Sequence, residues 1–540
     1  MTAPAKDPRA VEAERRWDEL KSLRAPHEPD WEDLARLIRP QRGGFSAANP
    51  GQHRTDKPLS SAPIIAQSNF SAGLYGTLTN PANKWMGLEL TDPDLMKWQP
   101  AREWLDLAGA RVLNSFGPHV SSFYDSAIQL FADLATFGNA CGYDEVDAQE
   151  RRILDVTLSL AQVVVAIDGY GRVVEVVRKF TLTPRQAVRM FGAERLSAKT
   201  VERAEKGQQE ATDYFHHVLA NVDWRRGTLG PRGKRWLSRY CAEGQVIREG
   251  GYQDMPFYFP RWEVDTGQCY GRGPGMTALP DARGVNLLED ANMRAGQRMA
   301  DPTILAPDRD AWALNGTLRP GSVVYGGVNA AGNPLIRPLD MDGRTGLTLE
   351  MQQAKVENIR DAFHWSLMNL AGRTGMTATE IMERQEEKLR LMAPHLGRVQ
   401  GEFLAPKISR RFGLLWSQGQ IPPPPAELGR EDVGLTVTYL SAAAMAQRSA
   451  EGVAVRRLVA DLAPLAQIKP RVMDRIDEDA LVEALHLSLG APATILRSRE
   501  AADALSEQRA QAEQAAAAMQ AAQVGGGVVR DLASAQGRAA

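Results

Sequence analysis

Two glycine-rich segments look at first like nucleotide-binding loops. Residues 230–235 (Gly-Pro-Arg-Gly-Lys-Arg) combine glycines with cations, but they lack the G-x-x-x-x-G-K-[ST] spacing and the hydroxyl that binds Mg²⁺ in a phosphate-binding loop. Gly271, Gly273 and Gly275 alternate, but Met276 stands where the dinucleotide motif G-x-G-x-x-G requires its third glycine. We therefore interpret residues 230–235 as a turn with exposed charges, and we predict no nucleotide cofactor.

The side chains that commonly bind metals or attack substrates are scattered. His216 and His217 are adjacent in an alternating, strand-like segment, so their rings should point to opposite faces and cannot chelate one ion together. No H-E-x-x-H, G-x-S-x-G or C-x-x-C motif occurs, and Cys141, Cys241 and Cys269 lie far apart. This cysteine usage predicts neither a disulfide framework nor a zinc site, and it fits a reducing cytoplasm.

Carboxylates gather in two places. Asp281, Glu289 and Asp290 fall in a helical segment, where we interpret them as a solvated face. Asp340 and Asp342 lie in a loop and could bind a divalent ion, although two carboxylates alone are a weak signal. The sequence therefore predicts no catalytic residues, no metal and no cofactor.

Length and charge limit the classes of protein to consider. At 540 residues the chain exceeds the roughly 250–300 residues that one hydrophobic core supports, so we expect about two to four domains. Its 43% apolar and 24% charged residues are typical of a soluble globular protein. The longest apolar run, Leu160–Ile167, is far shorter than the roughly 20 residues of a membrane helix, and the N-terminal segment lacks the apolar stretch of a signal peptide. The net charge of −2 excludes a globally basic nucleic-acid coat, so any DNA contact must be local.

Hydrophobic patterns predict a mainly helical α+β fold. Helices are expected at 31–39, with Asp30 as the N-cap, and at about 61–80, 100–116 and 121–137. Between 140 and 270 the period shifts toward two. This indicates strands at 163–167, 173–177 and 215–222, a hairpin turn at 168–171, a short helix at 184–192 and an aromatic edge at 256–260.

The second half of the chain alternates long helices with glycine- and proline-rich segments. Two helices, at about 278–300 and 347–371, flank the segment 302–346, which has strand fragments at 321–325 and 335–339. A glycine-bounded loop at 372–376 precedes a long helix to about 418, which Pro394 should kink. A strand is expected at 433–440. Residues 442–522 are alanine-rich and helical, and because they bury little area alone we expect them to pack against copies of themselves.

Five segments are informative together. They are Trp31-x-x-Leu34-x-x-x-Ile38-x-Pro40; Ala72-Gly73-Leu74 with Leu78-Thr79-Asn80-Pro81-x-x-Lys84-Trp85; Asp133-Leu134-x-x-Phe137-Gly138-Asn139-Ala140; Arg261-Trp262 with Tyr270-Gly271-Arg272-Gly273-Pro274 and Ala278-Leu279-Pro280-Asp281; and Thr377-Ala378-Thr379-Glu380-Ile381-x-x-Arg384, leading into Leu404-x-Pro406-x-x-x-Arg410. Each alone could be core or an ordinary turn. In this order and spacing the chain resembles the head-to-tail connector (portal) family of short-tailed double-stranded DNA bacteriophages. Met86 replaces the aromatic residue that often follows the tryptophan in that family.

The resemblance implies a portal fold, in which subunits assemble into a ring with a central channel. The implied parts are a wing of α/β structure, two stem helices, a clip with a small β unit, a tunnel loop and a helical crown. Their expected bounds are 1–276 and 378–440 for the wing, 278–300 and 347–371 for the stem, 301–346 for the clip, 372–376 for the tunnel loop and 441–523 for the crown, with 524–540 as a disordered tail. The stem residues available to neighbouring subunits are Met293, Met299, Phe363, Trp365, Leu367 and Leu370.

The resemblance also implies a function and partners. The ring, a dodecamer in virions, would be a conduit for double-stranded DNA during genome packaging and ejection. The terminase and then a tail adaptor would dock on the clip, and the major capsid and scaffolding proteins would meet the wing. The protein would be located at the portal vertex of the virion, and in the host cytoplasm during assembly.

The implied tunnel loop and clip supply the candidate site residues. Arg373 is the only charge of its loop, and repeated around a ring it would form a positive belt facing phosphate, with Gly372 and Gly375 as hinges beside Thr374. Arg373 could equally cap the C-terminus of the preceding helix. In the clip, Trp312 and Tyr325 are candidate anchors for a partner, or else part of the clip core or of a contact between subunits.

Two other classes of function stay open. One is an oligomeric helical scaffold that binds proteins and no DNA. The other is a packaging-associated ATPase or nuclease, which the missing phosphate-binding loop and carboxylate cluster disfavour.

Overall fold

In the computed structural model the chain folds into two units. The structure describes residues 6–42, 58–82, 84–90, 92, 95, 98–147, 152–300, 304–305, 328–334, 337–338, 345–368, 390–428, 437–441, 452–462, 464, 476–489, 495–497, 501–516 and 519. Unit 1 comprises Met1–Pro81 and Phe116–Arg410, and unit 2 comprises Ala82–Ser115 and Arg411–Ala540. Both contain helices and strands, so the α+β prediction is confirmed.

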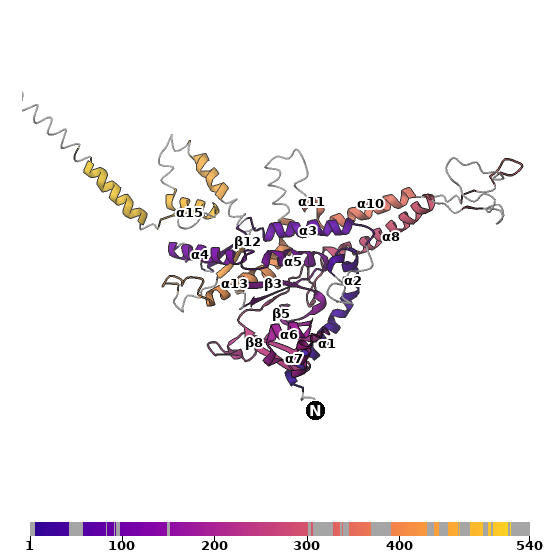
Figure 1. Cartoon of the computed structure of the whole chain (residues 1–540). Helices are drawn as coiled ribbons and strands as arrows, with labels where there is room; N and C mark the ends of the chain where they lie inside the picture. Colours follow the sequence, from indigo (N-terminus) through magenta and orange to yellow (C-terminus); the bar gives the residue numbers. More distant parts are fainter. Residues whose placement is uncertain are drawn as a thin grey trace, which may run out of the picture. The chain divides into compact units, whose positions relative to one another are not determined.

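Unit 1 contains most of the regular structure (Figure 1). Its helices are α1 (Pro8–Arg24), α2 (Glu28–Leu37), α3 (Ala62–Leu78), α5 (Phe123–Phe137), α6 (Pro184–Phe191), α7 (Ala198–Glu205), α8 (Pro274–Ala300), α10 (Thr345–Ala362) and α11 (Trp365–Met368). Its strands are β2 (Cys141–Asp147), β3 (Arg152–Leu158), β4 (Val163–Ile167), β5 (Val173–Leu182), β6 (Thr212–Ala220), β7 (Trp236–Ala242), β8 (Gln245–Tyr252), β9 (Phe257–Tyr258), β10 (Ile304–Leu305) and β11 (Arg337–Pro338).

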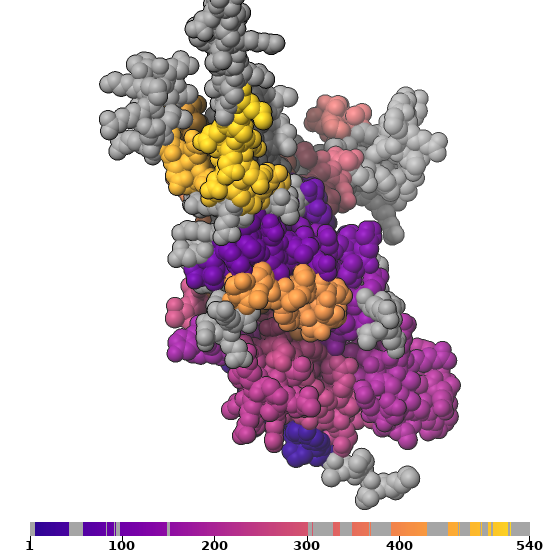
Figure 2. Space-filling model, turned by 90° about the vertical axis from the view of Figure 1, so that its left-hand side faces the viewer, coloured from indigo at the N-terminus to yellow at the C-terminus, as the bar shows by residue number. Residues whose placement is uncertain are grey.

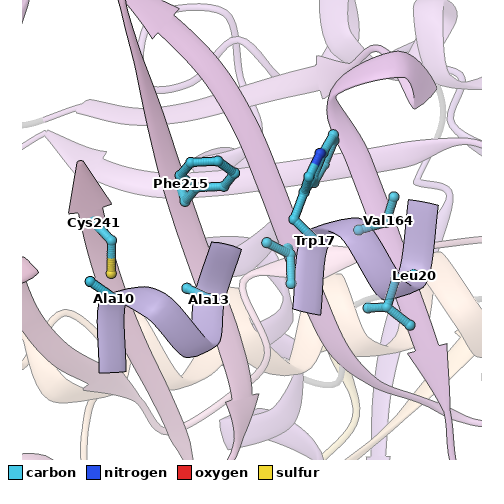
Figure 3. Close-up of a cluster of buried hydrophobic side chains, with 8 residues drawn as sticks. Ala10, Ala13, Trp17, Leu20, Val164, Phe215 and Cys241 are labelled. Atoms are coloured by element: carbon cyan, nitrogen blue, oxygen red, sulfur yellow. The ribbon is translucent and has the colours of Figure 1, made fainter. Parts of the chain in front are cut away.

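The largest sheet is an antiparallel meander in the order β4-β5-β6-β7-β8. Helix α1 covers one face because Ala10, Ala13, Trp17 and Leu20 recur at helical spacing and are buried against the strands. Figure 3 shows these side chains facing the sheet, and the Trp17 ring meets Phe215 edge-on at 6.3 Å between centroids.

Further contacts hold α1 and α6 on opposite faces of this sheet. The N–H of Asp7 donates to the carbonyl of Gly244 in the β7–β8 turn (2.9 Å), and Figure 2 shows the indigo start of α1 beside the magenta and pink surface of the sheet. On the opposite face, α6 packs on a second core cluster. A capping box of Thr183 and Gln186 starts α6.

The two adjacent histidines of β6 face opposite sides of the sheet, as the alternating pattern predicted. His216 is stacked on Tyr240, with 3.9 Å between ring centroids, and contacts Ser238 Oγ at 2.9 Å. His217 Nε2 lies 2.8 Å from Glu175 Oε1 instead, and Arg16 of α1 donates to the same carboxylate. Burial lowers the pKa of His216 well below its ordinary value, so this ring is neutral inside the core.

A three-stranded sheet, in the order β3-β2-β9, lies next to α5 in unit 1. The short strand β9 pairs only with β2 among the described residues, so the predicted aromatic edge is a sheet edge. The two-residue strands β10 and β11 pair antiparallel within the region between the two long helices.

Unit 2 is built on a strand pair that joins distant parts of the chain. Strand β1 (Met86–Leu90) pairs antiparallel with β12 (Val437–Ser441), and α4 (Gln99–Ser115) packs on β1. Trp104 of α4 donates its Nε1–H to the carbonyl of Pro422 (2.9 Å). Further helical residues are 452–462, α15 (Glu478–Leu489) and 501–516, which agrees with the predicted helical end of the chain.

Two local predictions were wrong, each for a physical reason. Helix α2 begins at Glu28 and not after Asp30, because Pro29 occupies its first turn and Asp30 lies inside it. Strand β6 ends at Ala220, since the Asn221 side chain bonds two carbonyls of the following loop.

The long helix after the glycine-bounded loop is described from residue 390, and residues 390–399 are helical on both sides of Pro394. The kink predicted at Pro394 stays a prediction. The helical hydrogen-bond pattern changes in the π-helix η8 (Gln400–Leu404), directly before α13 (Ala405–Ser417).

The contact of Glu175 with His217 and Arg16 predicts a pH dependence. Burial raises the pKa of Glu175, but hydrogen bonds from His217 and Arg16 outweigh it and lower the pKa from 4.5 to about 2. The resulting stabilisation is complete above a pH of about 4.5 and is lost as the pH falls towards about 2. We expect Glu175→Gln to lower the free energy of unfolding by about 2 kcal/mol at neutral pH, with the difference shrinking in acid.

Urea unfolding followed at several pH values measures this difference. Glu202→Gln is the control, because Glu202 is largely exposed and pairs with exposed Lys206, so its loss should cost under about 0.5 kcal/mol. Equal urea midpoints for Glu175→Gln and the unmodified protein at neutral pH would contradict the prediction.

Candidate functional site

Two long antiparallel helices, α8 and α10, form the most extended feature of unit 1 (Figure 1). At 1.5 Å per residue the 27 residues of α8 span about 40 Å. Polar side chains join the two helices: the Asn292 amide donates to Gln352 Oε1 (2.9 Å), and Lys355 pairs with Asp281 (3.0 Å). The predicted helix at 278–300 is therefore α8. The second helix ends at Ala362, where Phe363 and His364 form a turn.

The base of α8 rests on the end of α5 with no side chain between them. A Cβ atom on Gly273 would lie 2.6 Å from Cα and 2.7 Å from N of Gly138, and one on Gly275 would collide with the carbonyl of Thr136. Gly138 itself has a φ of 68°, the left-handed conformation that ends α5. Only glycine fits at these positions, so the alternating glycines are a packing device.

The close contact of Gly273 and Gly275 with the end of α5 is here named the glycine joint. Asn139 adds hydrogen bonds to it. Its side-chain amide donates to the carbonyls of Phe137 and Gly271 (both 2.9 Å), and its Oδ1 accepts the N–H of Gly271 (2.7 Å). The side chain is fully buried, and it binds both chain segments through their backbones. Two of the five family-like segments thus meet here.

Arg261 and Trp262 tie the same region to the helical residues near 400. Arg261 is buried and pairs with Glu402 (2.6 Å), and its guanidinium also donates to the carbonyl of Gly171 (2.8 Å). The Trp262 ring is stacked on His395, with 4.7 Å between centroids, and meets Phe70 of α3 edge-on at 5.4 Å.

Helix α2 is attached to this base through charge and aromatic contacts. Arg283 of α8 pairs with Asp30 (3.0 Å) and Asp33 (2.6 Å), and the Trp31 ring meets Tyr270 edge-on at 5.4 Å. The predicted solvated face of α8 is thus mostly paired: Asp281 with Lys355, Asp290 with Arg294, and Glu289 accepting from Gln352.

A buried ionic cluster joins strands β2 and β3 to residues 407 and 410. Asp144 and Asp155 of β2 and β3 bind Lys407 and Arg410, with Arg410 Nε 2.6 Å and Lys407 Nζ 3.2 Å from Asp144. All four side chains are buried. Burial alone lowers the pKa of Arg410, but the Asp144 carboxylate outweighs it and raises that pKa above its ordinary value. Removing one partner would leave a buried charge without its counter-charge, which is strongly destabilising. The cluster therefore holds Lys407 and Arg410 against strands β2 and β3.

The candidate residues of the tunnel loop and clip, Gly372, Arg373, Thr374, Gly375, Trp312 and Tyr325, lie outside the described residues. Glu402 and Lys407 were not predicted from the sequence. The available signal was a charge inside an otherwise apolar helical face, since Phe403, Leu404 and Ile408 beside them are all buried.

The outer half of the α8–α10 pair exposes apolar side chains. They are Leu287, Met293 and Met299 of α8 with Leu349 and Met351 of α10. Phe363, expected to be available to a neighbouring subunit, is instead buried and meets Phe70 at 6.1 Å. Within the described parts of the chain no group of His, Cys, Asp or Glu could hold a metal ion, and none of the described helices is long and apolar enough to cross a membrane.

Comparisons with known proteins cover nearly the whole chain. A sequence profile of the family described as "Bacteriophage head to tail connecting protein" matches residues 10–496. The portal protein of Salmonella phage epsilon15 is 28% identical over 515 residues, which is 93% of this chain and 91% of the relative. The probable portal protein of Bordetella phage BPP-1 is 28% identical over 520 residues, with the same coverage of both chains.

The glycine joint predicts a position-specific effect of a single methyl group. We expect Gly273→Ala to lower the free energy of unfolding by about 2–3 kcal/mol, because its Cβ would overlap backbone atoms of Gly138 that cannot move aside. Gly296→Ala, within α8 itself, is the control. A Cβ there has no neighbour within 4 Å, so it should stabilise α8 by about 0.5–1 kcal/mol. Urea unfolding and limited proteolysis of the two variants compare them, and a Gly273→Ala protein as stable as Gly296→Ala would refute the role of the joint.

Proposed function

Because this chain belongs to the bacteriophage head-to-tail connecting protein family and is a phage portal protein, we propose that its copies form a dodecameric ring around a channel for double-stranded DNA. Portal proteins are structural components of the virion at the head vertex. The ring serves genome packaging and later ejection, with assembly in the host cytoplasm. The chain itself carries out no catalysis.

The proposal of a ring rests on the apolar side chains exposed in the outer half of the α8–α10 pair. Its base is fixed in unit 1, but Leu287, Met293 and Met299 lie on the surface. In the proposed ring these side chains lie against neighbouring subunits, which contact each copy on two sides. A second copy of the chain is the occupant, and a head-to-tail contact repeated around an axis closes into a ring.

The charges of the same helices suit a channel through which DNA slides. Duplex DNA carries one negative charge per roughly 1.7 Å, so a bore of unpaired cations would bind it tightly. Arg283, Arg294 and Lys355 are each paired with a carboxylate instead. With a net charge of −2 for the whole chain, positive charge facing DNA is confined to a few places.

We assign those places by the family's architecture. Residues 372–376 form the tunnel loop, where Arg373 faces phosphate between Gly372 and Gly375, with Thr374 beside it. Residues 301–346 form the clip, which docks the terminase ATPase and later the tail adaptor through Trp312 and Tyr325. The wing, 1–276 with 378–440, meets the capsid and scaffolding proteins, and 441–523 form the crown.

The first test is the assembly state. We expect the purified protein to form rings of about a dozen subunits with an axial opening, seen by electron microscopy and sized by analytical ultracentrifugation. Leu287→Glu with Met293→Glu should shift the population to smaller species, because two carboxylates would have to be buried at each interface. Met190→Glu, an exposed methionine of α6, is the control and should leave the rings intact. A stable dimer would favour the DNA-free scaffold, and ATP hydrolysis by the purified chain would favour an enzyme.

The second test concerns the tunnel loop. Arg373→Ala should reduce the amount of DNA retained in packaged heads, whereas Arg373→Lys, which keeps the charge, should retain it. Packaging assays with DNase-protected DNA measure both. Normal retention by Arg373→Ala, together with a loss of stability of about 0.3–1 kcal/mol, would instead assign Arg373 to capping the preceding helix.

A further inference from the structure

The loop between β6 and β7 concentrates positive charge in a chain that is otherwise balanced. Residues 221–235, here named the basic hairpin, contain five cations and one carboxylate, Asp223. The cations are Arg225, Arg226, Arg232, Lys234 and Arg235. Its last six residues are the segment that resembled a phosphate-binding loop.

The basic hairpin has a defined conformation. The Asn221 amide donates to the carbonyls of Pro231 (3.1 Å) and Lys234 (2.8 Å), and the N–H of Arg225 donates to the carbonyl of Arg232 (2.9 Å). Gly233 packs so closely on the carbonyl of Thr228 that no Cβ would fit. The loop is therefore preorganised, which lowers the entropic cost of binding a partner.

Among the described residues, the cations of the basic hairpin lack partners of opposite charge. None of the five forms an ion pair with a carboxylate in the described part of the chain, and Arg235 lies over the Trp224 ring at 5.1 Å. Several cations elsewhere on the same sheet are paired, among them Arg239 with Glu12 and Glu249, and Arg248 with Glu145. Five uncompensated cations repel one another, and an anionic partner would relieve that repulsion.

Apolar side chains stand among these cations. Leu229 is 99% exposed and Val222 97%, and Trp224 is partly exposed. A phosphate backbone would use the cations and leave these groups in water, whereas a protein surface would bury both kinds. We propose that the basic hairpin is a docking site for an acidic segment of a partner protein, in which carboxylates flank apolar side chains.

This inference goes beyond the proposed channel function and stands on the hairpin alone. Its test uses the full-length protein and fluorescence anisotropy with a labelled peptide in which Asp and Glu alternate with Leu and Phe. The comparison peptide carries Asn and Gln at the acidic positions. At physiological salt we expect the acidic peptide to bind at least about tenfold more tightly than the amide peptide, and to lose affinity as salt is raised.

Two variants separate the contributions of charge and apolar contact. Arg225→Glu/Arg226→Glu/Arg232→Glu should weaken binding of the acidic peptide by at least about tenfold, and Leu229→Ser by about threefold or more. The matched controls are Arg189→Glu/Arg195→Glu/Lys199→Glu, three exposed cations of the α6–α7 region, and Met190→Ser. If the triple reversal fails to fold, Arg225→Gln/Arg226→Gln tests the same charges without adding repulsion.

The outcomes decide the proposal. Loss of binding in the hairpin variants, with the controls unchanged, supports it. Unchanged affinity in both hairpin charge variants overturns it. A labelled DNA duplex of about 30 base pairs is the competing probe. Duplex binding that is tighter than peptide binding, lost in the charge variants and insensitive to Leu229→Ser, would assign the hairpin to nucleic acid and overturn the proposal as well.

Discussion

The position of the N-terminal end of α8 depends on Gly273 and Gly275 having no side chain. Because Gly273 and Gly275 bring their backbone against Gly138 and Thr136, α8 leaves the body of unit 1 at a position set by main-chain contact. Main-chain atoms cannot rotate away as side chains do, so this joint tolerates little displacement. A helix that extends about 40 Å from this joint carries any angular error at its base to its tip, magnified by its length.

Buried charges perform the same task at other points of unit 1. Asp133 binds Arg39 and Arg42, Glu402 binds Arg261, and Asp144 and Asp155 bind Lys407 and Arg410. Such pairs gain little stability over apolar packing, but each buried charge needs its counter-charges close by and so selects one arrangement of the elements. For a subunit of the proposed ring, which would have to match identical neighbours, that selectivity matters more than the few kcal/mol involved.

The sequence predicted local structure and missed the joints between elements. The helical periodicity of α3, α4 and α5 and the turn before β5 were read correctly, because capping residues, prolines and glycines mark them locally. The glycines at 271–275 were compared with a cofactor motif and with a family pattern, and neither comparison predicted their packing role. Their real role depends on Gly138, which lies more than a hundred residues earlier, and periodicity contains no information about that contact.

The site residues, too, could be predicted only in part from the sequence. The family-like segments proved to hold the residues that meet around the base of α8, including Trp31, Asp133, Asn139, Arg261 and Arg410. Their partners Glu402 and Lys407 could not be found, because a single charge in an amphipathic helix looks like a boundary residue until its counter-charge is known.

The pairing of β1 with β12 has a consequence for biosynthesis. The sheet of residues 163–252 joins neighbours along the chain and can close while the ribosome is still translating. Strand β1 can pair only after β12, which begins at Val437, has been translated. In a nascent or prematurely terminated chain, the edge of residues 86–90 that would bind β12 therefore has no hydrogen-bonding partner strand. Incomplete translation products therefore carry an adhesive strand, and the cell's chaperones and proteases have a chemical feature by which to distinguish them from finished subunits.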